Sequence, residues 1–489
     1  MNSGQKLDNR NLNAEVVVVG GGGSGLAAAV AAAEKGASVV VLEKRHAVGG
    51  NAVFAEGFFA AESPAQQRMN IDARRDDLFK IAMDYSHWTI NPRIIRAFID
   101  KSGDTVRWLE DKGLKFDWIP ALYPNQVPLV WHCLKGRGAV IVRLLHKNCQ
   151  NLGVRLLRET AAKKILIDKK GRVIGILAST RERELRINTK SVIIATGGYA
   201  GNKELLKKYN SYYNEDMICG GLPHMGDGLL MAWEAGADSE GLGILQLIGP
   251  SFRGSRGGPG SEHMGVVATE PDTIWVNKEG ERFADEATTY NIFISVNAVL
   301  RQPDRVCYSI FDDKNVQRAM KEGVIKGAGI LIVPPRTRFP ELDKQLQSLA
   351  NKGSNVRISD SWDEMAQWIG AAPRKLKAAV DEYNDGCDRG YDAVFAKDRR
   401  YLVPLRNPPY YAMKCHPGFL GTIGGIKINQ HMEVVNVRGK PIPGLYAAGV
   451  DTGGWESDYY CAILSGTTFG FALNSGRIAA ENAVKYISC

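Results

Sequence analysis

Several motifs that would place a sequence in a large functional class are missing from this one. Its eight cysteines form no Cys-x-x-Cys pair, and no group of histidines and cysteines has zinc-site spacing. We therefore expect no metal, iron–sulfur or c-type haem site, and free thiols in a reducing compartment. No apolar run reaches the ~18 residues of a transmembrane helix, so we expect no integral membrane segment. Residues 1–13 lack the apolar core of a signal peptide, which favours a cytoplasmic protein.

Charge of one sign is also not concentrated in any segment. The net charge of +9 is spread over 489 residues, and the densest basic stretch, residues 181–186, alternates with acids. Such mixed stretches are typical of solvated faces, so we expect no nucleic-acid partner. No internal repeat or low-complexity tract is present. A hydrophobic content of 44% and a charged content of 24% are typical of a globular protein, here long enough for about two to four domains.

The strongest motif that is present is a glycine-rich turn near the start of the chain. Four valines at 16–19 predict a buried parallel strand, and an alanine-rich helix is expected over 26–35. Between them, Gly20, Gly22 and Gly25 have the G-x-G-x-x-G spacing. In that motif the first glycine permits a tight turn, the second lets the backbone approach a pyrophosphate, and the third lets helix and strand pack closely. The following helix N-terminus can bind phosphate through free N–H groups.

An acidic residue completes this unit. A second predicted strand, residues 37–42, ends at Glu43, whose carboxylate can accept hydrogen bonds from a ribose diol. A glycine triplet alone is a weak signal, but a strand–turn–helix–strand–acid unit is specific. The sequence therefore predicts a dinucleotide site; the competing interpretation is a glycine-rich turn in another kind of α/β protein.

The composition changes between about residues 240 and 400, which are glycine-rich at first and then helical and charged, without dinucleotide motifs. The last part, 401–489, returns to strands and glycine turns like those of 1–239. We therefore predict an α/β dinucleotide-binding domain in two segments, 1–239 and 401–489, interrupted by a second domain at 240–400.

Six further motifs occur in one order along the chain. They are Gly49-Gly50-Asn51, Ala195-Thr196-Gly197-Gly198, Gly226-Asp227-Gly228, the Gly280–Glu286 segment, Gly424-Gly425 and the Ile442–Gly449 segment. With the opening unit, this set resembles the flavoprotein subunit family of fumarate reductase and succinate dehydrogenase, especially its flavocytochrome c-like and 3-ketosteroid dehydrogenase branches. The resemblance implies that the cofactor is FAD. It also implies an α/β fold with a Rossmann-like FAD-binding domain, an inserted α+β capping domain, and an active site at their junction.

The resemblance assigns the FAD site to residues from both ends of the chain. The last helix begins at Thr467, and its N–H groups are expected to face the flavin edge that gains charge on reduction. The family's glutamate after Ala-Ala-Gly is replaced here by Val450, so Asp451 is the candidate substitute. Asn51 occupies the region where succinate dehydrogenases attach flavin to histidine, which predicts non-covalent FAD. The complete set of expected FAD contacts is Gly20, Gly22, Gly23, Ser24, Gly25, Glu43, Lys44, Gly49, Gly50, Asn51, Ala52, Gly57, Ala195, Thr196, Gly197, Asp227, Gly449, Asp451, Thr467 and Thr468.

The chain departs from fumarate-type members at the groups that bind two substrate carboxylates. The two family histidines correspond to Gly249 and Gly421, the proton-donating arginine to Tyr290, and the last arginine to a position in 459–466, which contains none. Burying two carboxylates without a cation is very costly. A dicarboxylate substrate is therefore disfavoured, unless an unaligned base such as Arg253 or Arg256 substitutes.

Tyr290 indicates a different chemistry. Ketosteroid dehydrogenases also place a tyrosine after this motif, where it exchanges a proton with the carbon next to the one that exchanges hydride. By the same resemblance Tyr459 or Tyr460, with Ser465 and Gly466, is a candidate to bind a ketone oxygen. The competing interpretation is that Tyr290 and Tyr459 are packing aromatics. Glu456 and Asp458 are candidates for a base or an amine-binding group, with solvated loop acids as the competing interpretation. His132 and His416 are candidate proton shuttles or structural histidines. Glu270 matches the family's proton-relay segment, but Thr273 stands where the family has an arginine.

The sequence thus predicts an FAD-dependent oxidoreductase acting on a C–C bond beside a carbonyl, with hydride exchanged at flavin N5 and Tyr290 handling the proton. We expect a hydrophobic ketone, such as a 3-ketosteroid or an aromatic enone, as the small-molecule substrate. An external electron donor or acceptor, either another protein, free flavin or a quinone-like carrier, would complete the reaction. The alternatives are a fumarate-type enoate reductase with a rebuilt carboxylate site and a flavin-binding protein without turnover.

Overall fold

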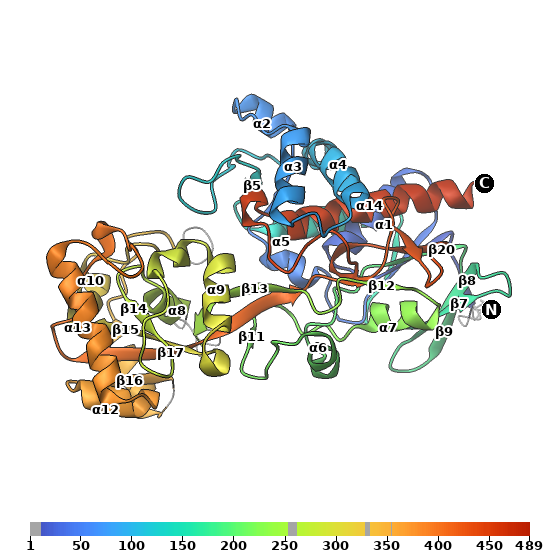
Figure 1. The fold of residues 1–489 in the computed structure, drawn as a ribbon. Helices are drawn as coiled ribbons and strands as arrows, with labels where there is room; N and C mark the ends of the chain where they lie inside the picture. Colours follow the sequence, from blue (N-terminus) through green and yellow to red (C-terminus); the bar gives the residue numbers. More distant parts are fainter. Residues whose placement is uncertain (1–10, 253–261, 328–332, 354) are drawn as a thin grey trace, which may run out of the picture. The chain divides into compact units, whose positions relative to one another are not determined.

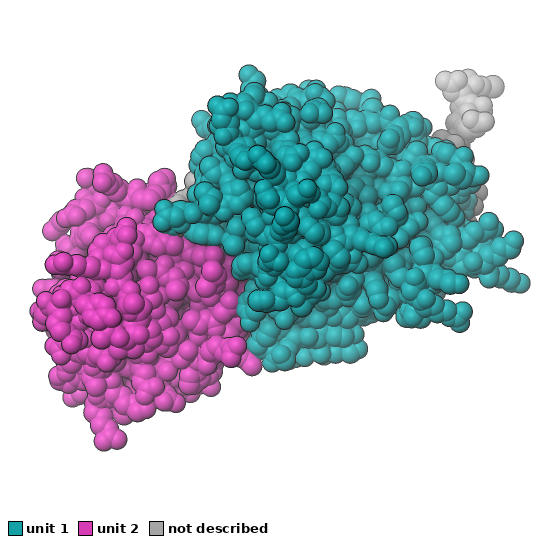
Figure 2. All heavy atoms as spheres, turned by 45° about the horizontal axis from the view of Figure 1, so that its top comes forward, with its two compact units in different colours: residues 1–213, 221–246, 421–489 teal, residues 214–220, 247–420 magenta. Residues whose placement is uncertain are grey.

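A computed structural model describes residues 11–252, 262–327, 333–353 and 355–489 (Figure 1). The chain divides into two compact units, coloured separately in Figure 2. The first contains residues 1–213, 221–246 and 421–489, and the second contains 214–220 and 247–420. The first unit is therefore assembled from both ends of the sequence.

The main sheet of the first unit has the strand order β19-β20-β10-β2-β3-β6. All neighbouring pairs are parallel except β19 with β20. The residues of β2, β3 and β10 are all buried, as expected for strands that are covered on both faces. The strands are β2 (Val16–Val19), β3 (Val39–Leu42), β6 (Arg155–Leu157), β10 (Ser191–Ile194), β19 (Glu433–Val435) and β20 (Pro441–Ala447).

Two helices from opposite ends of the sequence pack against each other beside this sheet, α1 (Gly23–Glu34) and α14 (Thr467–Ile487) (Figure 1). Alanines in α1 and Gly476 in α14 allow the close approach, because a Cβ on Gly476 would lie 2.3 Å from the carbonyl oxygen of Ser24. The helix α5 (Gly138–Asn151) also packs against α1. Together these contacts join the first and last segments of the chain.

The rest of the first unit consists of smaller elements. A second sheet has the order β1-β9-β8-β7, formed by β1 (Asn11–Asn13), β9 (Glu184–Asn188), β8 (Val173–Ser179) and β7 (Ala161–Ile167). Two short antiparallel pairs are β4 (Gly57–Phe59) with β5 (Trp131–Cys133), and β12 (Ser239–Glu240) with β18 (Gly425–Ile426). The remaining α-helices are α2 (Pro64–Arg68), α3 (Arg75–Tyr85), α4 (Pro92–Glu110), α6 (Lys203–Tyr209) and α7 (Asp227–Glu234).

The second unit is built around the long strand β17 (Tyr410–Thr422). It pairs with β15 (Cys307–Asp312), which pairs with β14 (Ile274–Val276), and also with β11 (Ile218–Cys219), β13 (Leu245–Phe252) and β16 (Val356–Ser359). Because most of β17 belongs to this sheet, the second unit continues to Leu420.

Alternating residues of this sheet form two separate cores. Cys307 and Phe311 belong to one buried cluster, while Tyr308 and Ile310 of the same strand belong to the other. Since successive side chains of a strand point to opposite faces, the sheet is covered on both sides. The first cluster includes residues of α8 (Glu262–Ala268), α10 (Asp313–Lys321) and α11 (Leu342–Asn351), and the second includes residues of α12 (Trp362–Ile369) and α13 (Pro373–Arg389). A further helix, α9 (Ile292–Leu300), precedes β15.

Within the described residues, no helix is both long and apolar enough to cross a membrane. The α/β fold predicted from the sequence, with a sheet of parallel strands interrupted by an α+β unit, is confirmed.

Candidate functional site

The glycine turn between β2 and α1 has the geometry that its spacing predicts. Gly20 has a φ of +108°, and a Cβ there would lie 2.1 Å from the carbonyl oxygen of Ala195. A Cβ on Gly25 would lie 1.9 Å from the carbonyl oxygen of Gly20. For Gly22 the nearest described atom, the carbonyl oxygen of Gly49, would be 3.9 Å away. Two of the glycines are thus required by packing, while the third keeps its backbone accessible to a ligand.

The N-terminus of α1 has no side-chain cap among the described residues and no acid in its first turn. Its first N–H groups are therefore available to an anion. A second glycine turn lies beside it, because the N–H of Gly49 donates to the carbonyl oxygen of Gly21 at 2.8 Å. Gly49 and Gly50 both have positive φ, and the Asn51 side chain accepts a hydrogen bond from the N–H of Leu222 at 2.7 Å. Residues 20–25 and 49–51 thus form one continuous backbone surface.

Glu43, at the end of β3, is buried beside this surface. One carboxylate oxygen accepts a hydrogen bond from the N–H of Gly21 at 2.8 Å, and the other accepts from the N–H of Arg45 at 2.8 Å. Lys44 forms an ion pair with Asp227 at 2.5 Å. The structure therefore brings together three residues that were expected to contact FAD from distant positions in the sequence.

Asp451 connects the C-terminal segment of the chain to the turn at residues 196–198. It lies at the end of the 3₁₀ helix η6 (Gly449–Asp451) and is 1% exposed. Its carboxylate accepts hydrogen bonds from the hydroxyl and N–H of Thr196, from the N–H of Gly197 at 3.0 Å and from the N–H of Gly198 at 2.9 Å. Burial nevertheless raises the pKa of Asp451 above its usual range. These four bonds occupy the carboxylate, so in this structure Asp451 braces the 196–198 turn.

His224 was not identified from the sequence. Its Nδ1 atom is buried and has no hydrogen-bond partner among the described residues. Its ring lies 3.0 Å from the position of a Cβ on Gly197. Burial, together with the nearby cations Arg45 and Lys44, lowers the pKa of His224 to about 4. The sequence signal that could have identified it is its place two residues before the Gly226-Asp227-Gly228 motif.

At the N-terminus of α14, Tyr460 contacts the first residues of the helix. The hydroxyl of Tyr460 accepts hydrogen bonds from the N–H of Gly466 at 2.9 Å and from that of Thr467 at 3.1 Å. Tyr460 thus acts as a helix cap in this structure, and the N–H of Gly466, a candidate to bind a ketone oxygen, donates to it. Burial raises the pKa of Tyr460 to about 12. Tyr459, in contrast, is 48% exposed.

Ser465 also forms hydrogen bonds within this loop. Its hydroxyl donates to the carbonyl oxygen of Ala462 at 2.7 Å and accepts from the Gln126 side chain at 2.7 Å. The hydroxyl of Thr468 differs from that of Ser465, since it is buried and has no hydrogen-bond partner in the part of the chain that the structure describes. Thr468 therefore retains hydrogen-bonding capacity for a cofactor.

Glu456 is buried, not a solvated loop acid. It is 5% exposed and lines a cavity of about 20 Å³, large enough for one water, among apolar residues of α3 and α4. Burial raises its pKa to about 8. Asp458, two residues later, is exposed as expected of a loop acid.

Tyr290 ends the 3₁₀ helix η2 (Glu286–Tyr290) of the second unit. Its hydroxyl lies 3.0 Å from that of Tyr401, at the end of η5 (Arg399–Tyr401). Burial, more than any other effect, raises the pKa of Tyr290 above its usual range. The half-buried phenol therefore stays protonated at neutral pH.

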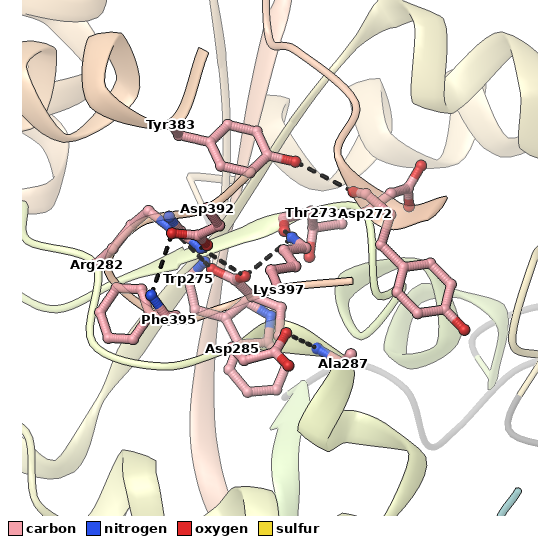
Figure 3. Close-up of polar contacts among 12 residues, drawn as sticks. Asp272, Thr273, Trp275, Arg282, Asp285, Ala287, Tyr383, Asp392, Phe395 and Lys397 are labelled. Atoms are coloured by element: carbon pink, nitrogen blue, oxygen red, sulfur yellow. Dashed lines mark hydrogen bonds and ion pairs between the residues drawn. The ribbon is translucent and has the colours of Figure 1, made fainter. Parts of the chain in front are cut away.

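A network of buried charges lies at the start of η2 (Figure 3). Glu286 accepts hydrogen bonds from Arg282 at 3.1 and 3.2 Å and from Lys397 at 2.9 Å, and Arg282 also donates to Asp392 at 3.0 Å. These ion pairs hold the pKa of Glu286 below its ordinary value against the effect of complete burial. The Gly280–Glu286 segment, one of the family motifs, therefore anchors the 3₁₀ helix that ends at Tyr290.

Glu270, the candidate relay residue, is also buried. Burial, with the nearby Asp272, raises its pKa to about 7. Its carboxylate accepts hydrogen bonds from the N–H of Ile325 at 2.5 Å and of Lys326 at 3.2 Å, and Arg318 approaches it to 3.7 Å. The cation expected three residues after Glu270 comes instead from α10. The sequence could not reveal this because Arg318 is distant along the chain.

The positions of the missing fumarate-type cations carry no compensating group that the sequence analysis identified. No described atom lies within 4 Å of a Cβ built on Gly421, and the carbonyl oxygen of Gly249 accepts a hydrogen bond from the Ser295 hydroxyl. Arg253 and Arg256 lie outside the described residues.

The two candidate histidine shuttles are both buried. His132 contacts the Ser63 hydroxyl at 2.7 Å and the Val130 carbonyl oxygen at 3.0 Å, and burial lowers its pKa to about 4. This arrangement is that of a structural histidine. His416 is 5% exposed, on β17 of the second unit.

The residues of the first unit fit an FAD. The open backbone at Gly22, the uncapped start of α1 and the unpartnered Nδ1 of His224 all provide groups that a dinucleotide can satisfy. The fold and this site define a flavin-dependent oxidoreductase.

Comparison with known proteins agrees. Residues 15–460 match the family model described as FAD binding domain, and the chain belongs to that family. It is 35% identical to a vinyl phenol reductase of Lactiplantibacillus plantarum over 469 residues, which cover 92% of each chain.

Solved structures show the same fold. A flavocytochrome c3 fumarate reductase in its open conformation has a TM-score of 0.75 and 27% identity, covering 97% of this chain and 79% of that one. A 3-ketosteroid-Δ4-(5α)-dehydrogenase of Rhodococcus jostii has a TM-score of 0.73 and 24% identity, covering 99% and 98%. The resemblance stated from the motifs is confirmed: the chain is an FAD-dependent oxidoreductase that acts on C=C or CH–CH groups.

Proposed function

We propose that this chain reduces the C=C bond of an apolar conjugated substrate, with Tyr290 as the proton donor. The observation that carries this proposal is a half-buried phenol at the position where fumarate-type members have an arginine. A phenol can give a proton but cannot pair with a carboxylate as a cation does. The substrate class is accordingly an aromatic enone or a 3-ketosteroid, and the vinyl phenol reductase relative extends it to an alkene conjugated with an aromatic ring.

The vinyl phenol reductase relative and the protonated phenol of Tyr290 both support reduction as the direction. A group that is protonated at neutral pH is ready to act as a general acid, and would have to be deprotonated first to act as a base. In reduction, hydride reaches one carbon and Tyr290 protonates its neighbour. The double bond then becomes a single bond, and a tyrosinate remains to be reprotonated.

FAD, when bound, supplies the hydride and takes up electrons again from an external donor. This chain's own residues bind and orient it. The uncapped N-terminus of α1 would hold the pyrophosphate, Glu43 would accept hydrogen bonds from the ribose, and Asn51, where succinate dehydrogenases have a histidine, would leave the flavin without a covalent link. The external donor is a protein, free reduced flavin or a quinol-like carrier.

The test is anaerobic. The protein is loaded with FAD, reduced with dithionite, and mixed with 4-phenylbut-3-en-2-one, 4-vinylphenol, a 3-keto-4-ene steroid or fumarate, and flavin reoxidation is followed by absorbance. We expect reoxidation by at least one of the first three and not by fumarate. Tyr290→Phe should slow it by about 100-fold or more, the usual contribution of a general acid, while Tyr391→Phe, at an exposed tyrosine of the same unit, should not.

Turnover of fumarate alone would identify the fumarate-type alternative. Reoxidation by none of the compounds, or an unchanged rate in Tyr290→Phe, would overturn the proposed function.

A further inference from the structure

Tyr290 has one close hydroxyl neighbour among the described residues. The Tyr401 hydroxyl donates to it at 3.0 Å, and the two rings lie 6.0 Å apart at an angle of 41°. Tyr401 is 9% exposed, and it ends a short 3₁₀ helix that Asp398 caps by accepting from the N–H of Arg400 at 3.0 Å. Accepting this hydrogen bond leaves the proton of Tyr290 free to point elsewhere.

One buried ion pair holds the segments that carry the two tyrosines. Glu286 lies four residues before Tyr290, and Lys397 lies four residues before Tyr401. Lys397 Nζ donates to Glu286 Oε2 at 2.9 Å, and both side chains are 0% exposed. Lys397 also donates to the carbonyl oxygen of Thr273 at 2.8 Å. The pair therefore fixes η2 and the start of η5 relative to each other and to the end of the Glu270–Thr273 turn.

Stability alone is a weak reason for this arrangement. A buried ion pair often contributes little compared with apolar residues of the same volume, because desolvation offsets the attraction. What such a pair does provide is a fixed geometry, since either charge without its partner would be strongly unfavourable. The competing interpretation is that the network only stabilises the second unit. In that case the hydrogen bond between the two tyrosine hydroxyls has no role in the reaction.

We propose that Tyr401 is a positioning residue that orients the Tyr290 hydroxyl and returns its proton, with the Glu286–Lys397 pair setting their spacing. This inference rests on the proposed function. The steps balance as follows: Tyr290 gives a proton to the substrate carbon, the resulting phenolate takes the proton of Tyr401, and Tyr401 takes one from water. No electrons pass through either tyrosine.

The surroundings of the pair suit that sequence of steps. The cation of Arg400 favours the ionised form of Tyr290, and its guanidinium lies 5.4 Å from the centre of the Tyr401 ring. The hydrogen bond with Tyr401 and the charge of Glu270, in contrast, both raise the pKa of Tyr290 and so oppose its ionised form. Because only Arg400 among these groups favours ionisation, a Tyr290 phenolate takes up a proton readily from a hydroxyl beside it.

The test compares Tyr401→Phe with Tyr308→Phe, a buried tyrosine of the same unit whose hydroxyl donates to the Ile369 carbonyl oxygen at 3.3 Å. Stopped-flow reoxidation of the reduced, FAD-loaded enzyme is measured with 4-phenylbut-3-en-2-one and with 4-vinylphenol, in H₂O and in D₂O, between pH 6 and 9. We expect Tyr401→Phe to slow reoxidation by about tenfold, a fraction of a full general-acid contribution, and to enlarge the solvent isotope effect. The substrate concentration for half-maximal rate, FAD content and melting temperature should stay as in Tyr308→Phe.

The outcomes separate this inference from the proposed function. If Tyr290→Phe loses activity but Tyr401→Phe matches Tyr308→Phe in rate and isotope effect, the inference is wrong and the proposed function stands. A slower Tyr401→Phe whose isotope effect and pH profile are unchanged, or whose melting temperature falls with the rate, would show a structural role only. If neither compound is reduced by the wild-type enzyme, the inference fails with the proposed function.

Discussion

Lys397 donates a hydrogen bond to Glu286 at 2.9 Å, and neither side chain is exposed to solvent. Glu286 has a second cationic partner, Arg282, so the pair is part of a larger network in which each charge is compensated. Removal of one member leaves the others without full compensation in a site from which water is excluded.

Lys397→Met is therefore expected to destabilise the protein by about 3–5 kcal/mol, the usual cost of removing one partner of a buried pair. Urea unfolding followed by fluorescence measures it. The double variant Glu286→Leu/Lys397→Met should lose less than Lys397→Met alone, because the charges that remain, Arg282 and Asp392, then balance each other. An equal or larger loss in the double variant would contradict this account of the pair.

The second prediction concerns cofactor retention. Gly25→Ala would place a methyl group 1.9 Å from a backbone oxygen that cannot move away, so α1 must shift from β2. We expect most of the bound FAD to be lost, measured as flavin absorbance per protein after gel filtration. Gly421→Ala is the matched control, since no described atom lies near its new methyl group, and it should retain FAD. Full flavin content in Gly25→Ala would contradict the assigned role of this glycine.

The turn that contains Gly25 shows which features of the protein could be predicted from the sequence. The Val16–Gly25 unit obeys local rules, since four buried valines, a fixed glycine spacing and an alanine-rich helix are all read within one short window. The fold class followed from such windows, and the FAD cofactor followed from the resemblance carried by the whole set of motifs.

The sequence did not predict the ion-pair partners that come from distant segments of the chain. Arg318 approaches Glu270 and Lys397 binds Glu286, yet nothing near either cation in sequence indicates its carboxylate. Burial of Glu456 was missed for a related reason: its neighbours Ser457 and Asp458 are polar, and only the packing of α3 and α4 over it removes it from water. Long-range packing decides these features, and the local sequence does not encode it.

The third prediction follows from that burial. The pKa of Glu456 is raised to about 8 from 4.5, so the folded state holds a proton that the unfolded state has already lost between those values. The stability present at low pH is therefore lost as pH rises through this window, by at most about 1.4 kcal/mol per pH unit from this group.

Glu456→Gln removes the titrating proton. The difference in unfolding free energy between Glu456→Gln and wild type should grow in favour of the variant from pH 5 to pH 8 and then level off. Urea unfolding across that range measures it, with Asp458→Asn as an exposed control. Parallel pH profiles for Glu456→Gln and wild type would show that the carboxyl is solvated.

A fourth prediction concerns how FAD is held. With Asn51 where a flavin-linked histidine would stand, FAD should be released on acid precipitation and recovered in the supernatant. Flavin that remains with the precipitated protein would show a covalent link. Asn51→Ala should weaken binding, because the Asn51 side chain also holds the N–H of Leu222 at 2.7 Å.

The last prediction separates the two neighbouring tyrosines before α14. Tyr460→Phe removes the acceptor of two N–H groups, and leaving them unsatisfied in a buried site should cost about 1–3 kcal/mol. Tyr459→Phe, at a residue that is 48% exposed, should change stability by less than about 0.5 kcal/mol. Thermal unfolding of both FAD-free proteins gives the comparison without any substrate. If Tyr460→Phe is as stable as wild type but slows flavin reoxidation by an enone, its hydroxyl binds the ketone as the motif comparison suggested. A loss of stability in the FAD-free protein would instead establish it as the cap of α14.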